Sequence, residues 1–239
     1  MNRTDYAYAL RRDGARLAEA ASGNLGLPVP SCPGWTIADL VWHTGEVHWF
    51  WTLIANGELS SPDDYIEPER PPADALLAWF TEGVEQCAAA LEQLDPALPR
   101  WSWASRKDVG FIQRRMAQET AVHAWDALAA VGRDEPIERE LAVDGVAEFL
   151  AHFRSATPPA DFPDAGLHLH ATDGPGEWSV RAVDGTWQVS LEHGKGAAAV
   201  KGTASDLLLL LWQRRTVEQL ETFGDADALK AILAAFDRD

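Results

Sequence analysis

The sequence predicts an α+β protein, with an N-terminal bundle of four helices in residues 1–155 and a smaller α+β domain in residues 156–239. Two observations support this prediction. Apolar residues recur with the helical period of 3.6 before about residue 155, and with the period of two that is typical of strands after it. The period changes at a proline-rich segment, residues 155–166, which we interpret as an interdomain linker.

Long stretches of the first part have helical periodicity and are separated by proline-containing breaks. Pro72 suits a helix start, and Thr36 with Asp39 three residues later resembles a capping box. A further helix precedes the linker. We expect these helices at roughly residues 4–22, 36–57, 73–94, 111–131 and 139–153.

Strand-like alternation follows the linker. Leu167 and Leu169 alternate with His168 and His170, and the DGT sequence at 184–186 is a plausible hairpin turn. Apolar residues continue the alternation at Trp178, Val180 and Ala182, and again at Trp187, Val189 and Leu191.

Helical character returns near the C-terminal end of the sequence. A strongly apolar helix is expected from about Ser205 to Arg214, opened by Thr203 and Asp206 in the spacing of a cap. Another helix is expected at 225–236, so the second part is α+β.

An excess of acidic residues limits the class of partner. The chain has 37 acidic and 20 basic residues and a net charge of −17, which repels phosphate backbones and anionic lipid surfaces alike. The longest apolar run, Leu207 to Trp212, is too short to span a bilayer, and the first twenty residues contain no apolar stretch of signal-peptide length. We therefore expect a cytoplasmic protein with small-molecule partners, and neither nucleic acid nor membrane.

The two cysteines restrict the kind of metal site. Cys32 and Cys87 are not in a CxxC spacing, so the sequence indicates neither a disulfide framework nor a thiolate zinc site. Any metal must be held by histidine and carboxylate.

Three polar residues lie on helix faces that are otherwise apolar. His43 is one, in the 36–57 helix; Glu119 and His123 lie one turn apart in the 111–131 helix. A buried carboxylate is costly unless it is paired or bound to a metal. Two ligands on one helix and a third from a facing helix would make a metal site whose fourth position stays open, as in catalytic zinc sites.

The pattern leaves alternatives open. Glu119 could pair with Arg115 four residues earlier, and His43 and His123 could be core histidines bonded to backbone carbonyls. Asp126 could orient the imidazole of His123 or be an ordinary solvated charge. Zinc suits the ligand types best, with nickel, iron or manganese also compatible.

Other histidines are interpreted as structural. His48 lies about 140° around the helix from His43, so it does not share that site easily. His168 and His170 could form a metal pair, but they lie on the polar face of a strand, and a solvated strand face is favoured.

The segments around these residues resemble a known family. SCPGWTIADLVWHTGEVHWFW and RRMAQETAVHAWDA are similar to the DinB-like metal-binding domain of mycothiol-dependent maleylpyruvate isomerases. VKGTASDLLLLLWQRR and ETFGDADAL are similar to that family's smaller C-terminal domain, which resembles sterol-carrier proteins. The resemblance covers nearly the whole chain and favours metal binding over core histidines.

The resemblance implies a zinc ion held by His43, Glu119 and His123, with mycothiol in the open position. A metal-bound thiol loses its proton near neutral pH, whereas a free thiol has a pKa of about 8.5. In the family, addition of the sulfur to a conjugated double bond permits rotation before the thiol leaves. Neither Cys32, in the loop before the second helix, nor Cys87, in the third helix, is then needed as a nucleophile.

The resemblance also implies a substrate-binding arginine in the LWQRR segment. Arg214 is the better match and Arg215 the second; the alternative for Arg214 is a cation favoured by the dipole at a helix C-terminus. The leading hypothesis is a mycothiol-dependent isomerase or S-transferase acting on a small electrophile. The alternative is a non-catalytic metal-binding or regulatory module whose second domain carries an apolar ligand; a fourth protein ligand on the metal would favour it.

Overall fold

The structure is a computed structural model, and it describes residues 1–154, 157–158 and 166–236. The chain divides into two compact units, Met1–Ile137 and Glu138–Asp239. The predicted boundary at residue 155 differs from this division, which falls before the helix that precedes the proline-rich segment. Most of the segment interpreted as a linker lies outside the described residues.

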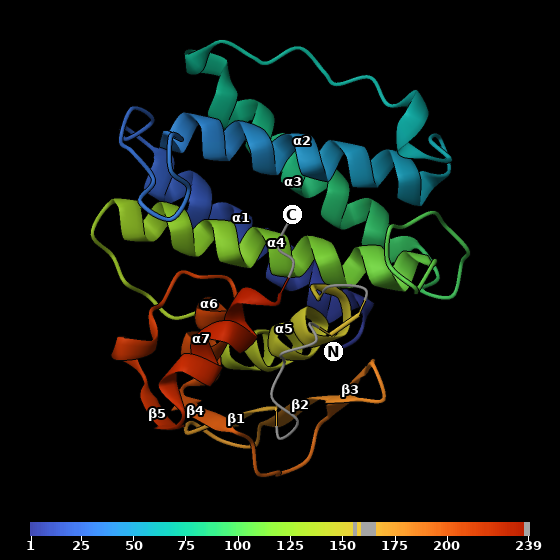
Figure 1. The fold of residues 1–239 in the computed structure, drawn as a ribbon. Helices are drawn as coiled ribbons and strands as arrows, with labels where there is room; N and C mark the ends of the chain where they lie inside the picture. Colours follow the sequence, from blue (N-terminus) through green and yellow to red (C-terminus); the bar gives the residue numbers. More distant parts are fainter. Residues whose placement is uncertain (155–156, 159–165, 237–239) are drawn as a thin grey trace. The chain divides into compact units, whose positions relative to one another are not determined.

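The first unit is a bundle of long helices, α1 to α4 (Figure 1). Helix α1 packs against α3 and α4, and α2 packs against the same two helices. All of the predicted helices of this region are present, and their ends differ from the expected ones by at most two residues. The helices are α1 (Arg3–Ala21), α2 (Ile37–Asn56), α3 (Ala73–Gln93) and α4 (Val109–Ala130), with a short 3₁₀ turn at Pro62–Asp64.

The ends of α2 show why the sequence folds locally as predicted. The Thr36 side chain accepts from the backbone of Asp39 and the Asp39 carboxylate accepts from the backbone of Thr36, so the predicted capping box is confirmed. Gly57 ends the helix in the left-handed conformation, with a φ of 80°. These caps fix the part of the chain that carries His43.

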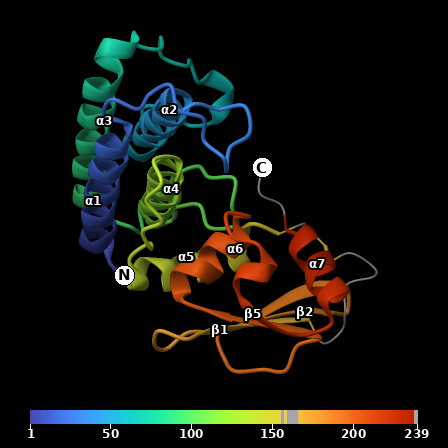
Figure 2. The same ribbon diagram turned by 90° about the vertical axis from the view of Figure 1, so that its left-hand side faces the viewer.

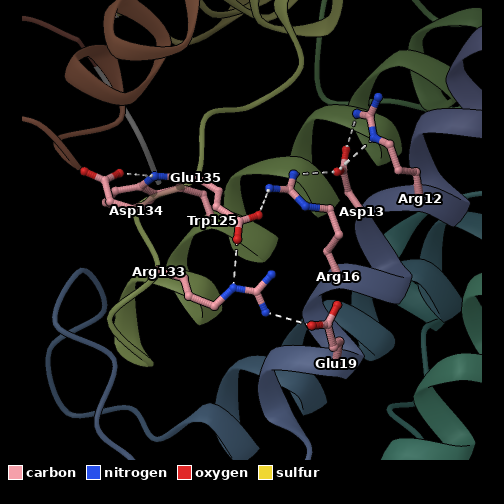
Figure 3. A network of polar contacts seen from close by, with 8 residues as sticks. All are labelled: Arg12, Asp13, Arg16, Glu19, Trp125, Arg133, Asp134 and Glu135. Atoms are coloured by element: carbon pink, nitrogen blue, oxygen red, sulfur yellow. Dashed lines mark hydrogen bonds and ion pairs between the residues drawn. The ribbon is translucent and has the colours of Figure 1, made fainter.

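A polar network ties the segment after α4 to α1 (Figure 3). Asp13 is fully buried and accepts from Arg12 at 2.6 Å and from Arg16 at 3.1 Å. Arg16 also contacts Glu135 at 3.1 Å, and Glu135 accepts from Arg133 at 2.8 Å. Arg133 also donates to Glu19, which completes the network, and a separate hydrogen bond joins Trp125 to Asp134.

The described residues of the second unit form a five-stranded sheet in the order β3-β2-β1-β4-β5. Strand β1 pairs antiparallel with β2 and parallel with β4. The helices of the unit lie over one face of the sheet (Figure 2). The strands are β1 (Leu167–Ala171), β2 (Glu177–Val183), β3 (Thr186–Ser190), β4 (Ala198–Gly202) and β5 (Glu221–Gly224); the helices are α5 (Arg139–His152), α6 (Ala204–Leu211) and α7 (Ala226–Ala234), with a 3₁₀ turn at Val217–Gln219.

Helix α5 packs against α6, which explains why it belongs to the second unit. Phe149 of α5 meets Trp212, just after α6, edge to face with ring centroids 5.0 Å apart, and it meets Phe236 at 5.3 Å. The apolar face of α5 is therefore buried with the sheet domain.

The second unit also differs from expectation in its strands. The predicted hairpin turn is confirmed, because Asp184 and Gly185 join β2 to β3 with φ angles of 49° and 70°. The apolar alternation of β3 does not correspond to burial, since Val189 is 36% and Leu191 65% exposed. Strands β4 and β5 were not predicted. None of the described helices combines the length and hydropathy needed to cross a bilayer.

Candidate functional site: a His–Glu–His cluster

His43 of α2 converges with Glu119 and His123 of α4. Glu119 Oε1 lies 3.1 Å from His123 Nε2 and 3.5 Å from His43 Nε2. The two imidazole rings meet at right angles with centroids 5.3 Å apart. The three potential ligand atoms all lie within 4.8 Å of one another. The sequence prediction that these three residues meet is thus matched by their positions.

The cluster is open on one side. The side chain of His123 is 9% exposed, that of Glu119 20% and that of His43 36%. His43 therefore points less fully into the core than its helix face predicts. Partial exposure of two members leaves room for a small molecule to reach the group, which a sealed core histidine would not allow.

Arg115 holds the second oxygen of Glu119. Its guanidinium is 5% exposed and donates to Oε2 at 3.0 Å. The alternative pairing of Glu119 with Arg115 is therefore present, but it uses the oxygen that does not face the histidines. Oε1 remains directed at His43 and His123, so the ion pair and the cluster coexist.

Asp126 holds the second nitrogen of His123. Its Oδ2 lies 2.9 Å from His123 Nδ1, and the carboxylate is fully buried. Ser31 donates to Oδ1 at 2.6 Å, and the Cys32 thiol lies 3.8 Å from Oδ2. Asp126 is therefore no solvated charge: it fixes the ring so that Nε2 faces the cluster.

The loop before α2 contacts both histidines, directly or through Asp126. Trp35 packs on His43 with ring centroids 4.9 Å apart, while Ser31 and Cys32 reach Asp126. The SCPGW sequence indicated only a break between helices and part of a resemblance. The contacts of Ser31 and Cys32 with Asp126 were missed because they join residues nearly a hundred positions apart.

Neighbouring charges outweigh burial in setting the pKa values of His123 and Glu119. Burial lowers the pKa of His123, but the neighbouring carboxylates of Glu119 and Asp126 outweigh it and raise the pKa to about 9. Burial raises the pKa of Glu119, yet His123, His43 and Arg115 hold it well below its usual range. A divalent cation can also bind at this place, because a carboxylate with imidazoles beside it offers the cation both negative charge and donor atoms.

The donor set fits a divalent transition metal. His43, Glu119 and His123 supply two imidazole nitrogens and one carboxylate oxygen, and the remaining polar atoms of Glu119 and His123 are held by Arg115 and Asp126. Among the described residues, no fourth histidine, cysteine or carboxylate belongs to this group.

A second group of potential ligands, Cys32, His123 and Asp126, shares one histidine with the first. Both oxygens of Asp126 already accept from Ser31, Cys32 or His123. We therefore interpret this group as the support of His123. The other cysteine, Cys87, is buried in α3, where burial raises its pKa to about 12.

His48 has the structural surroundings expected of it. It is fully buried, stacks on Phe80 at 6.0 Å and lies 2.7 Å through Nε2 from the Thr120 hydroxyl. That hydroxyl donates to the carbonyl of Met116, so it accepts from His48. Burial lowers the pKa of His48 to about 4, and the ring is neutral.

Arg214 lies beyond the helix in which it was predicted. Helix α6 ends at Leu211, and Gln213 adopts the left-handed conformation with a φ of 60°, so the chain turns before Arg214. Arg214 donates to the carbonyl of Trp212 at 2.8 Å, a contact typical of a cation near a helix end. Arg215 donates to Asp206 at 3.0 Å. The binding of a substrate by Arg214 stays a prediction.

The HxH pair is not a solvated strand face. His168 is 6% exposed and lies 2.6 Å from Glu177, which also lies 2.6 Å from His170. The sequence did not reveal this carboxylate, because it comes from the neighbouring strand.

Comparison with known protein families covers most of the chain. The sequence profile of the mycothiol maleylpyruvate isomerase N-terminal domain matches residues 7–128, and the profile of the corresponding MDMPI C-terminal domain matches residues 140–231.

Individual proteins match this chain at low sequence identity or over only part of its length. Two Mycobacterium tuberculosis proteins, uncharacterized protein MT0763 of strain CDC 1551 / Oshkosh and uncharacterized protein Rv0738 of strain H37Rv, are each 30% identical over 141 residues, which is 56% of this chain and 69% of theirs. The crystal structure of the mycothiol-dependent maleylpyruvate isomerase superimposes on this chain with a TM-score of 0.63 at 14% sequence identity. The crystal structure of its histidine-to-alanine mutant gives the same TM-score at 15% identity. Each match covers 93% of both chains. These two structures share the fold.

Proposed function

This chain belongs to the mycothiol maleylpyruvate isomerase family, and on that premise we propose that it is a metal-dependent, mycothiol-using isomerase or S-transferase. Its substrate would be a small electrophile that carries a carboxylate. The observation that supports the proposal most is the partly exposed cluster of His43, Glu119 and His123, in which Arg115 holds the second oxygen of Glu119 and Asp126 the second nitrogen of His123.

The residues of the cluster and those that surround it would divide two tasks, metal binding and orientation of the ligands. His43, Glu119 and His123 would hold the metal, zinc by preference for these ligand types. Arg115 and Asp126 keep Glu119 and His123 in one orientation. When bound, the metal would lower the pKa of a coordinated thiol, and mycothiol would supply reversible addition to a conjugated double bond.

The alternative of a non-catalytic metal-binding module is less well supported. A structural metal is normally enclosed by four protein ligands, whereas a catalytic one keeps an open position. The described cluster has three ligands and an exposed side. We therefore favour an enzyme.

The proposal is tested by turnover of maleylpyruvate by the full chain. We expect isomerisation that requires mycothiol, stops when a chelator removes the metal and returns when zinc is added back. His123→Ala should abolish turnover, while His152→Ala, in the last turn of α5, serves as a control for loss of a histidine elsewhere. Turnover that survives complete metal removal would refute the metal proposal. Metal binding without any thiol binding would favour the non-catalytic module.

A further inference from the structure

Glu177 of β2 gathers histidines from two other parts of the second unit. Its Oε2 lies 2.6 Å from His168 Nε2 and 3.5 Å from His193 Nδ1, and its Oε1 lies 2.6 Å from His170 Nδ1. The rings of His168 and His193 meet edge to face at 4.8 Å. From the sequence, His168 and His170 could form a metal pair, although a solvated strand face was favoured; Glu177 and His193 were not expected beside them.

The strand register explains how β1 and β2 contribute. His170 lies directly opposite Glu177 in the antiparallel pair, and His168 lies opposite Ser179. Residues two apart on a strand share a face, so both histidines and the carboxylate project from the same side of the sheet. The buried Leu167 and Leu169 project from the other side, toward the core.

The segment after β3 is fixed to β2 on both sides of His193. Ser179 donates to the carbonyl of Glu192 at 3.0 Å, and Arg181 donates to the carbonyl of Lys195 at 2.9 Å. These two bonds hold the segment over β2, and His193 lies between them in the chain.

A close approach of the backbone accompanies these bonds. A Cβ at Gly194 would lie 2.8 Å from the Ser179 hydroxyl, and one at Gly196 would lie 2.4 Å from the carbonyl oxygen of Ala198. Glycine is therefore required at position 196, where the neighbours are backbone atoms, whereas a side chain at position 194 would displace the Ser179 hydroxyl. His193 is held near Glu177 by the backbone, although its own side chain is 74% exposed.

We propose that His168, Glu177 and His193 form a second metal site, independent of the cluster in the helical bundle. Their potential ligand atoms lie within 4.8 Å of one another, and two imidazoles with one carboxylate suit zinc, nickel or copper. His170 keeps the other oxygen of Glu177 in place, the task that Arg115 performs for Glu119. The exposed side of His193 leaves the metal accessible to a further small ligand.

One oxygen of Glu177 is presented to imidazoles from two different segments of the chain. Oε2 of Glu177 faces two imidazole nitrogens at once, 2.6 and 3.5 Å away. Without a metal this oxygen can accept from both rings, since a carboxylate oxygen has two lone pairs. When the two imidazole nitrogens are deprotonated, all three groups become electron-pair donors that face a common point, as metal binding requires.

Zinc titration of the full chain tests the proposal, with the number of bound ions as the readout. We expect His193→Ala to bind one zinc ion fewer than the unmodified chain. The same loss should occur in a His123→Ala background, where the proposed site of the bundle is disabled. Because His193 is largely exposed, its replacement should leave the fold intact. His152→Ala is the matched control and should bind as many ions as the unmodified chain.

Two further variants separate metal binding from general structure. His170→Gln should keep the number of ions but weaken binding at this site about tenfold, as expected for a residue that only orients a ligand. His168→Ala should abolish zinc binding at this site. An unchanged number of bound zinc ions in both His193→Ala and His168→Ala would overturn the proposal, whatever His123→Ala does. If only the proposed site of the bundle does not exist, His123→Ala will bind as many ions as the unmodified chain, while His193→Ala still binds one fewer.

Discussion

Asp126 and Arg115 define the cluster of the bundle as much as its three potential ligands do. Each is almost fully buried and each occupies one atom of a ligand, so that Oε1 of Glu119 and Nε2 of His123 are the atoms left facing His43. A ligand held in one orientation binds a metal with less loss of conformational freedom.

Replacing Asp126 should weaken metal binding without removing any ligand. In Asp126→Asn the carboxylate that accepts from His123 Nδ1 becomes a neutral amide, so the imidazole is less basic and less firmly oriented. We expect zinc affinity at this site to fall roughly tenfold to hundredfold, as measured by competition with a chelating dye.

The control for that substitution is Asp13→Asn. Asp13 is an equally buried aspartate of the same unit, paired with Arg12 and Arg16 and not with a histidine. It should lower the free energy of unfolding, by roughly 2 kcal/mol for lost hydrogen bonds to charged groups, and leave zinc affinity unchanged. Equal zinc affinity in Asp126→Asn and the unmodified chain would contradict an orienting role for Asp126.

Arg214→Lys examines the selectivity of the proposed enzyme. A guanidinium binds a carboxylate through two parallel hydrogen bonds, whereas an ammonium keeps the charge and loses that geometry. We expect kcat/KM for a carboxylate substrate to fall while zinc and mycothiol affinities stay the same. Arg215→Lys is the matched control, because Arg215 already pairs with Asp206. Equal turnover in the two variants would contradict a substrate-binding role for Arg214.

At this scale the sequence was sufficient to select three residues that lie together, but not to identify the residues that hold them in place. His43, Glu119 and His123 could be selected because each is polar on an apolar helix face, a local property. The contacts of Ser31 and Cys32 with Asp126 depend on how the loop folds back over α4, and helical periodicity carries no information about that.

At the level of secondary structure, the start of α2 rests on the reciprocal bonds of Thr36 and Asp39. The hydrogen bonds from Thr36, together with Arg70, lower the pKa of Asp39 to about 2, below the ordinary value of about 3.9. A carboxylate whose pKa is lower in the folded than in the unfolded chain stabilises the fold above its unfolded pKa, and loses this effect as pH falls toward its folded pKa.

Asp39→Ala should therefore destabilise the protein in a pH-dependent way. We expect a loss of roughly 1 kcal/mol in the free energy of unfolding at neutral pH, measured by urea denaturation. The difference from the unmodified chain should shrink as pH falls from about 4 to 2. Asp74→Ala, which removes an exposed carboxylate from the first turn of α3, should cost only a few tenths of a kcal/mol, roughly. A difference that stays constant down to pH 2 would show that the carboxylate charge is not responsible.

Helices were more predictable than strands in this chain. Long amphipathic segments with caps, such as α2, indicate both their type and their ends. Strand β4 consists largely of alanine, valine and glycine, and β5 has only four residues at the sheet edge, all exposed, so neither has a clear apolar alternation. Their places beside β1 come from tertiary pairing.

At the scale of the whole molecule, the chain has two units, each with its own cluster of histidines around one glutamate. The sequence predicted two parts but assigned α5 to the first. An amphipathic helix shows which of its faces is buried, and not which neighbour buries it; the contacts of Phe149 with Trp212 and Phe236 decide that in favour of the second unit.

The central proposal is that His43, Glu119 and His123 hold a metal to which mycothiol binds through sulfur. X-ray absorption at the zinc edge tests it most directly, on the His193→Ala protein loaded with one zinc ion, so that the second proposed site does not contribute. Without mycothiol the spectrum should contain only nitrogen and oxygen neighbours at about 2.0–2.2 Å. With saturating mycothiol a single sulfur neighbour should be added at about 2.3 Å. A spectrum that shows no sulfur at saturating mycothiol would contradict the account.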